Sequence, residues 1–281
     1  MTYKIPEEPP EEIIRAYNDG YLAIFIGAGL SENFGIPLWG GLVNNLLNTC
    51  LKNVDGFTKK DYNYYKSQDY KKAISYVKSI LGDSFFEQIK TKLGKIKNWD
   101  DENNIYKKLF EFMVDKDING NINDCSGIFL TTNADLCLDN FFNEKEIINS
   151  PDKLDENFHI HLEDADNNIK LVHLHGSIKD KDSLVFTDED YLNQYKKTDY
   201  IKLLDIIFNK YTILFMGYSL SEWEILKFLI DNLDWKHQKK HFVLLGYPED
   251  NTEKIIEINK IKNDHENNGL KIIPYDYTYT E

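Results

Sequence analysis

Residues 21–37, YLAIFIGAGLSENFGIP, join an unbroken apolar run to a glycine-containing loop. A continuous apolar run is typical of a strand buried on both faces of a parallel sheet. Gly27 and Gly29 let the following backbone pass close to a ligand, and Ser31 adds a hydroxyl group. The spacing is not the dehydrogenase G-x-G-x-x-G fingerprint, because Glu32 stands where the third glycine is required. The stretch predicts a strand followed by either a phosphate-binding loop or a plain strand-to-helix turn.

Five further apolar runs follow along the chain, with helical patterns between them. They span residues 126–132, 170–176, 211–217, 241–246 and 270–275. Strand and helix in alternation predict a Rossmann-like α/β fold, with a doubly wound, mostly parallel sheet of about six strands. A first helix is expected from near Pro10 to Asn18, and another over residues 219–233.

Residues 51–124 contain no convincing strand pattern. Helices are expected around residues 59–81, 84–93 and 105–114. We therefore predict a Rossmann domain formed by residues 1–50 and 125–281, with residues 51–124 as a helical insertion that covers the site.

Composition narrows the classes of function. The chain has 47 acidic and 33 basic residues, a formal net charge of −14, and Arg15 as its single arginine, which disfavours direct nucleic-acid binding. Its three cysteines include no C-x-x-C pair, so a disulfide framework or a four-cysteine zinc site is not expected. No apolar run approaches the roughly 20 residues of a membrane span, and the N-terminus is unlike a signal peptide. We expect a soluble, cytoplasmic protein with reduced thiols.

Polar side chains follow the strands where a parallel sheet binds its ligands, beyond the carboxyl ends. After the second, third and fourth strands these are Asn133, Asp135, His173, His175, Gly217 and Ser219. His173 lies deeper in its strand and is expected to be a hydrogen-bonded core residue. His175 ends the strand, where Gly176 is expected to open space beside it, so His175 is the candidate to meet a ligand and titrate near neutrality.

A metal site is an alternative use of the histidines. His159 and His161 form a second H-x-H pair, and four imidazoles could coordinate zinc or copper. Nothing in the sequence shows that the two pairs converge, so no metal is expected.

Four motifs occur in order at the strand ends. They are GAGLS with FGIP (27–37), TTNAD (131–135), HLHGS with TDEDY (173–191) and GYS (217–219). Together they resemble the sirtuin superfamily, and most closely the sirtuin-like domains of prokaryotic antiphage defence systems. The resemblance covers residues 20–46 and 126–225.

The resemblance implies roles for individual residues. The NAD phosphates and the adjoining ribose would be lined by Gly27, Ala28, Gly29 and Ser31, and the adenosine end would be contacted by Gly217 and Ser219. Asn133 would hold the nicotinamide-side ribose or the attacking water, Asp135 would bind the carboxamide, and His175 would be the catalytic histidine. The resemblance gives no role to Thr187, Asp190 and Tyr191.

The implied activity is NAD hydrolysis to nicotinamide and ADP-ribose, with NAD as substrate. In defence systems such an enzyme is a toxic effector held inactive until triggered, as a homo-oligomer or by a partner such as a DNA-translocase-type ATPase or a prokaryotic Argonaute. The alternatives are a protein deacylase, an ADP-ribosyltransferase, or a non-catalytic NAD or ADP-ribose sensor. The missing zinc ribbon, and Leu38, Trp39 and Gly40 where deacylases have Asp-Phe-Arg, count against a deacylase.

Overall fold

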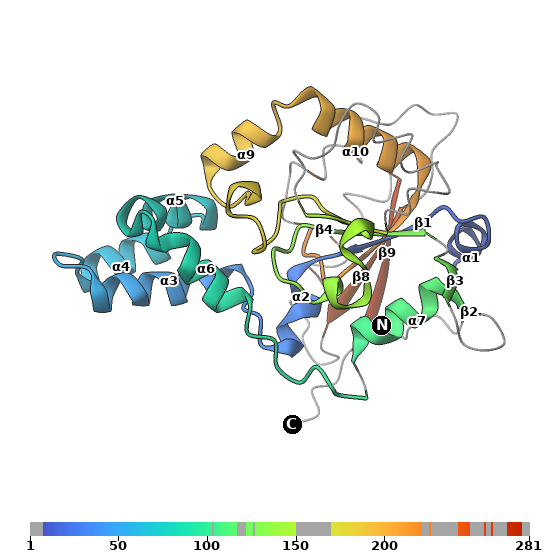
Figure 1. The fold of residues 1–281 in the computed structure, drawn as a ribbon, viewed down its shortest axis with the longest axis horizontal. Helices are drawn as coiled ribbons and strands as arrows, with labels where there is room; N and C mark the ends of the chain where they lie inside the picture. The colour runs from blue at the N-terminus through green and yellow to red at the C-terminus, as the bar shows by residue number, and fades with distance from the viewer. Residues whose placement is uncertain are drawn as a thin grey trace. The chain divides into compact units, whose positions relative to one another are not determined.

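The computed structural model describes residues 8–102, 104–116, 122–125, 127–149, 170–220, 241–247 and 269–276, with the single positions 225, 256 and 260. Seven strands form one parallel sheet in the order β5-β6-β4-β1-β7-β8-β9. Four of them, β1, β4, β8 and β9, are labelled in Figure 1. In chain order they are β1 (Leu22–Ile26), β4 (Gly127–Thr131), β5 (Ile147–Ile148), β6 (Leu171–His173), β7 (Thr212–Met216), β8 (His241–Tyr247) and β9 (Leu270–Asp276). Later strands lie on both sides of β1, with β7, β8 and β9 in chain order on one side and β6 between β4 and β5 on the other. This is the doubly wound arrangement predicted from the sequence.

Contacts divide the chain into two compact units. One contains Met1–Gly27, Leu109–Leu130 and Lys202–Glu281, and the other contains Ala28–Lys108 and Thr131–Ile201. The division expected from the sequence, with residues 51–124 as a separate insertion, remains a prediction.

The first unit is built around β1, which pairs in parallel with β7 from Leu22 opposite Thr212 to Ile26 opposite Met216. All five residues of β1 are buried, as its unbroken apolar run requires. The strands β8 and β9 extend the sheet in parallel beyond β7. Helix α1 (Glu11–Asn18) begins after Pro10 and has two acidic residues in its first turn, as expected.

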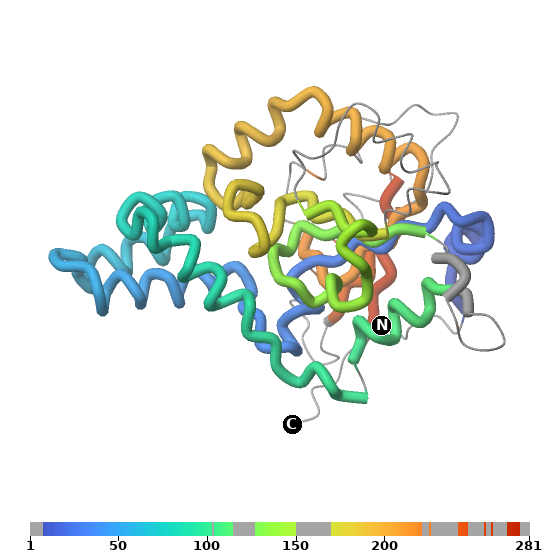
Figure 2. The backbone as a smooth tube through the Cα atoms, in the orientation of Figure 1, coloured from blue at the N-terminus to red at the C-terminus, as the bar shows by residue number. Residues whose placement is uncertain are grey.

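The second unit contains a run of helices whose backbone folds back on itself repeatedly (Figure 2). These are α2 (Ala28–Ser31), α3 (Trp39–Asn53), α4 (Lys59–Lys66), α5 (Tyr70–Leu81) and α6 (Ser84–Leu93), followed later in the chain by α9 (Asp188–Gln194). Thr58 caps α4 in a reciprocal capping box with Asp61, and the Asp69 side chain caps α5. The buried face of α5, which includes Ile74 and Val77, packs on α3.

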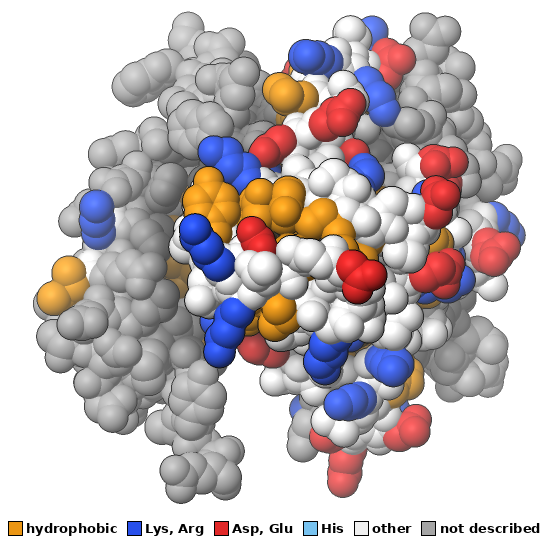
Figure 3. All heavy atoms as spheres, turned by 90° about the vertical axis from the view of Figure 1, so that its left-hand side faces the viewer, with side chains coloured by type: hydrophobic (Ala, Val, Ile, Leu, Met, Phe, Trp, Pro, Cys, Tyr) orange, Lys and Arg blue, Asp and Glu red, His pale blue; other side chains and the backbone are white. Residues whose placement is uncertain are grey.

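One face of the molecule on the side of this helical run collects apolar side chains into a band bordered by lysines and acidic residues (Figure 3). Among the exposed aromatic residues, Tyr64 belongs to α4 and Tyr70 to α5.

Helix α7 (Ile105–Met113) and helix α10 (Thr198–Lys210) each continue from one unit into the other. After α7, the chain forms a two-stranded antiparallel hairpin of β2 (Val114–Lys116) and β3 (Ile122–Cys125). The expectation that residues 51–124 contain no strand was wrong at this point. A short two-stranded ribbon does not need the continuous apolar run by which the buried strands were recognised.

Strand β5 was also not expected, since two residues are too few to form a pattern. The helix expected over residues 219–233 falls mainly outside the described residues. In the described part of the chain, no helix is long and apolar enough to cross a membrane.

Candidate functional site

A single buried hydroxyl connects the polar residues of the site. Ser31, at the end of α2, donates a hydrogen bond of 2.8 Å from Oγ to Oδ2 of Asp135. Its Oγ accepts a hydrogen bond of 3.1 Å from Nδ2 of Asn133 and lies 2.6 Å from the hydroxyl of Tyr106. Since Ser31 has one proton and gives it to a carboxylate, the Tyr106 hydroxyl must donate to Ser31. We call these four residues the Ser31 cluster.

The backbone around Asn133 and Asp135 is held by local hydrogen bonds. The amide of Asn133 donates to Oγ1 of Thr131 at 2.9 Å. The amide of Cys137 donates to Oδ1 of Asp135 at 3.0 Å, so the two carboxylate oxygens of Asp135 have different partners. Both residues are therefore placed at the end of β4 with little freedom to turn.

A small cavity of about 40 Å³ adjoins the Ser31 cluster. Asn133 and Asp135 border it, and the rest of its lining is mostly apolar: Ala28, Ile36, Pro37, Trp39, Leu42, Leu93, Thr132, Ala134 and Phe186. The rings of Trp39 and Phe186 meet edge to face, with centroids 5.4 Å apart. An apolar slot with an amide and a carboxylate at its border suits a flat ring that carries an amide group. Its volume is well below the roughly 300–1,000 Å³ usual for small-molecule sites, so the walls must move apart for a ring to be enclosed.

The Tyr106 hydroxyl and the Cys137 thiol stay protonated because both are buried and lie near the carboxylate of Asp135. Burial, and then the carboxylate of Asp135, raise the pKa of Tyr106 well above its usual value. The same two causes, in the same order, raise the pKa of the Cys137 thiol. Tyr106 is therefore a hydrogen-bond donor at neutral pH, and Cys137 is a thiol with no nucleophilic character.

His173 is buried and hydrogen bonded, as predicted. Its Nδ1 lies 3.0 Å from the carbonyl oxygen of Asn133, and its Nε2 lies 2.9 Å from Oδ2 of Asp139. Asp139 also forms an ion pair of 2.9 Å with Lys179. Burial alone would raise the pKa of Asp139, but His173 and Lys179 outweigh it and lower the pKa. His173 thus anchors the backbone of Asn133.

His175 is enclosed by tyrosines and does not titrate near neutrality, which corrects the sequence-based expectation. Its side chain is 1% exposed, with Nε2 at 3.2 Å from the hydroxyl of Tyr195 and Nδ1 at 3.4 Å from that of Tyr191. Burial, and then the positive charge of Lys71, lower the pKa of His175 to about 3. Lys71 itself sits over the ring of Tyr191, 3.7 Å from the centroid. His175 is therefore neutral, and it hydrogen bonds to these tyrosines rather than to Asn133 or Asp135.

Gly176 does not open space for a ligand beside His175, which corrects the sequence-based expectation. Its φ angle is +73°, and a Cβ atom there would lie 2.1 Å from the carbonyl oxygen of Ser183. Glycine is required at this position because the backbone of Ser183 packs directly against it and leaves no room for a side chain.

The glycine motifs of the first unit pack against each other. The amide of Gly27 donates to the carbonyl of Met216 at 2.9 Å, and a Cβ atom on Gly27 would lie 2.5 Å from the carbonyl oxygen of Gly217. The space that a side chain would need at Gly27 is thus filled by the chain at the end of β7. Ser219 is exposed in the same unit, whereas Ala28 and Gly29 begin helix α2 in the second unit, where Gly29 is exposed.

Several residues that shape the site were missed by sequence reasoning. Tyr106 lies far from the motifs, whereas Phe186 directly precedes TDEDY and Tyr195 follows it by four residues. None of the three carries a local signal of its role. Thr187 and Asp190 form a capping box at the start of α9, a pattern that the T-x-x-D spacing could have predicted.

Among the described residues, no group of three or more histidine, cysteine, aspartate or glutamate side chains is arranged to hold a metal ion. His159 and His161 lie outside the described residues.

A parallel, doubly wound sheet with polar residues at its strand ends is typical of nucleotide-binding α/β proteins. Residues 127–265 match the family model of the SIR2-like domain, and this match supports a sirtuin-like domain in that part of the chain and indicates an NAD-related function. No curated protein matches the chain.

Proposed function

We propose that this protein is an NAD hydrolase, which converts NAD and water into ADP-ribose, nicotinamide and a proton. The observation that carries the proposal is the Ser31 cluster, in which one hydroxyl fixes an amide and a carboxylate at the border of an apolar slot. Cleavage of the glycosidic bond releases a neutral amide from a cationic ring. The protein must therefore orient the leaving group and an acceptor more than it must create a strong nucleophile.

Each residue of the cluster has a role in this proposal. The carboxylate of Asp135 accepts a hydrogen bond from the nicotinamide carboxamide, while the apolar slot takes the ring. Asn133 holds the adjoining ribose or the attacking water. Ser31 and Tyr106 keep both side chains in place, since each hydrogen bond of the cluster limits rotation of the next.

His175 is the proposed general base. A neutral imidazole is the correct form for accepting a proton, and a general base whose pKa lies near the working pH contributes about 10²–10⁴-fold to the rate. With its pKa at about 3, the buried His175 is a weak base until its surroundings change. In this structure both ring nitrogens face tyrosine hydroxyls, so His175 reaches a ribose hydroxyl or a water molecule only after Tyr195 or Tyr191 has moved. Together with the small volume of the slot, this supports an enzyme that is held inactive until it is triggered.

The cellular role that we propose is that of a toxic effector in antiphage defence. A homo-oligomer or a partner subunit, such as a DNA-translocase-type ATPase or a prokaryotic Argonaute, would supply the trigger. The acidic net charge fits a chain that leaves nucleic-acid contact to its partner.

The test is to incubate the protein, alone and with the product of its neighbouring gene, with NAD and to quantify nicotinamide and ADP-ribose. Asn133→Ala and His175→Ala are expected to lower turnover by about 10²-fold or more. Asn140→Ala, which changes an exposed asparagine of the short 3-10 helix Leu138–Phe141 that follows, is the control and should retain full turnover. Full turnover in both site variants would contradict the assigned roles.

A non-catalytic sensor is the second candidate, and the burial of His175 between two tyrosines favours it. It predicts that NAD or ADP-ribose binds while no condition releases nicotinamide. Deacetylation of an added acetylated peptide would instead identify a deacylase, and transfer of ADP-ribose to an acceptor would identify a transferase.

A further inference from the structure

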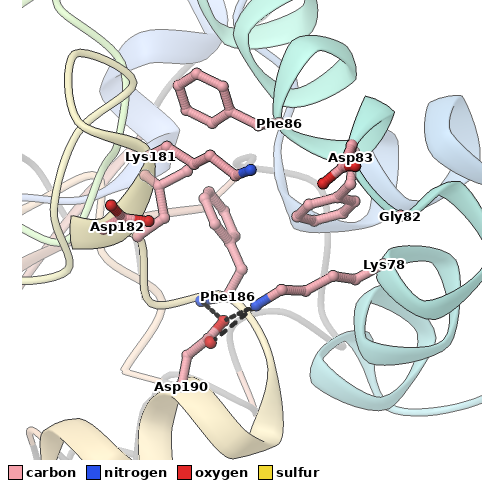
Figure 4. Close-up of a pocket in the computed structure, with 10 residues that line it drawn as sticks. Lys78, Gly82, Asp83, Phe86, Lys181, Asp182, Phe186 and Asp190 are labelled. Atoms are coloured by element: carbon pink, nitrogen blue, oxygen red, sulfur yellow. Dashed lines mark hydrogen bonds and ion pairs between the residues drawn. The ribbon is translucent and has the colours of Figure 1, made fainter.

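A second and larger cavity lies in the same unit, bordered by α5, α6 and residues 181–190 (Figure 4). Its volume is about 440 Å³, within the range of roughly 300–1,000 Å³ that is usual for small-molecule sites. It shares Phe186 with the smaller slot but includes none of the Ser31 cluster. The proposed reaction makes no use of it.

The deeper walls of this cavity are aromatic. Phe85 and Phe186 are each 6% exposed, and Phe86 is half-buried. In Figure 4 the rings of Phe86 and Phe186 lie on either side of the Lys181 ammonium group. Such walls favour a ligand with an apolar ring, because ring-on-ring contact adds to the free energy of burying the surface.

The rim of the cavity carries charges of both signs. Lys78 and Asp190 are committed to each other in an ion pair of 3.0 Å. Lys181 and Asp83 are exposed, and neither side chain has a hydrogen-bond or ion-pair partner among the described residues. Lys181 points toward the side of the cavity that carries Asp83 (Figure 4). Asp182 also lies on the rim, so two carboxylates, of Asp83 and Asp182, stand against the single ammonium group of Lys181 outside the Lys78–Asp190 ion pair. This excess of negative charge disfavours a phosphorylated or otherwise polyanionic ligand.

We propose that this cavity binds a small aromatic zwitterion, of which a free aromatic amino acid is the simplest example. The ring would rest on Phe86 and Phe186, the carboxylate would meet Lys181, and the ammonium group would meet Asp83. Phe186 also contacts Trp39 of the smaller slot, so a ligand seated on Phe186 changes the surroundings of the Trp39 indole.

The test uses three related probes, whose binding is followed by saturation-transfer NMR. They are L-phenylalanine, phenethylamine, which lacks the carboxylate, and 3-phenylpropionate, which lacks the ammonium group. L-phenylalanine is expected to bind about 3- to 5-fold more tightly than either of the others, as solvent-exposed ion pairs allow. It should also change the tryptophan fluorescence of the protein but not that of a Trp39→Phe variant.

Two variants test which protein side chain meets each charged group of the ligand. Lys181→Met should weaken L-phenylalanine and leave phenethylamine unchanged, whereas Asp83→Asn should weaken L-phenylalanine and leave 3-phenylpropionate unchanged. The proposal is overturned if L-phenylalanine does not bind at about 10 mM, a concentration that detects even very weak sites. It is also overturned if the variants weaken all three probes equally, or if neutral N-acetylphenylalanine amide binds as tightly as the zwitterion. None of these measurements depends on NAD turnover, so their failure would leave the proposed function standing.

Discussion

His175 shows how burial determines the chemistry of a single residue. At the protein surface an imidazole titrates near neutrality, but here it is enclosed by Tyr191 and Tyr195, with the charge of Lys71 nearby. The hydroxyls satisfy its ring nitrogens and burial keeps it neutral. The imidazole is thus in the neutral form that a base requires, but it is buried and out of contact with solvent.

The lowered pKa of His175 predicts how stability depends on pH. In the unfolded chain the imidazole binds a proton below about pH 6.5, whereas in the folded protein it does so only near pH 3. Between these values the unfolded state holds more protons, so the free energy of unfolding falls as pH falls, by up to about 1.4 kcal/mol per pH unit. Urea titrations at pH 7.5, 6 and 5 measure this slope.

His175→Gln removes the titrating group and should flatten the curve between pH 6.5 and 4. Asp139 has a pKa lowered from 3.8 and contributes below about pH 5, so the slope between pH 6.5 and 5 separates the two residues. An unchanged slope in the Gln variant would contradict the buried, neutral state of His175.

Gly176 offers a prediction about close packing. Ala at this position must adopt a φ of +73° and place its Cβ against the carbonyl of Ser183. We expect Gly176→Ala to lower the free energy of unfolding by about 3 kcal/mol or more, from backbone strain and overpacking together. Gly56 is the matched control, because its φ is +81° but nothing lies within 4 Å of the added Cβ. Gly56→Ala should cost about 1 kcal/mol, and equal losses in urea denaturation would contradict the close approach of Ser183.

At the scale of elements, helix α9 is fastened at its start to helix α5. The amide of Asp188 donates to the hydroxyl of Ser75 at 3.2 Å, and Lys78 pairs with Asp190. The next residue after Asp190 is Tyr191, which lies against His175. The start of α9 therefore links the helical run to the proposed base.

Thr187→Ala tests this link by removing the N-cap of α9. It should lower the free energy of unfolding by about 1 kcal/mol and also change the rate of nicotinamide release, because Tyr191 sits in the first turn of the loosened helix. Thr58→Ala removes the equivalent cap of α4, which has the same capping box away from His175. The control should show a similar loss of stability with an unchanged rate. If both variants changed the rate alike, α9 would have no special connection to the site.

For the whole molecule, the sequence was sufficient to predict the strands that are buried on both faces. Continuous apolar runs predicted β1, β4, β6, β7, β8 and β9, and the pattern of strand and helix predicted the doubly wound sheet. Short strands such as β5 lie below the length at which a pattern exists. Sequence order also placed Asn133 and Asp135 correctly at one strand end.

The details of the site depend on contacts that no local pattern encodes. The Ser31 cluster joins Ser31 to Tyr106, which is 75 residues away, and to Asp135, which is 104 residues away. The hydrogen-bond partners of His175 are tyrosines of a later segment, and the space beside Gly176 is filled by the backbone at Ser183. Motif spacing indicated which residues to inspect, and only the packed chain showed which of them meet.

The charge of the whole chain leads to a final prediction about nucleic acid. A net charge of −14, and a single arginine at position 15, disfavour a large cationic surface from which counterions on DNA would be displaced. On the face shown in Figure 3, lysines lie among acidic residues. We expect no binding of a 30-base-pair duplex in fluorescence anisotropy at about 150 mM salt, where non-specific binders show dissociation constants of roughly 10⁻⁴–10⁻⁶ M. Binding that weakens steeply as salt rises would place DNA contact in this chain rather than in a partner.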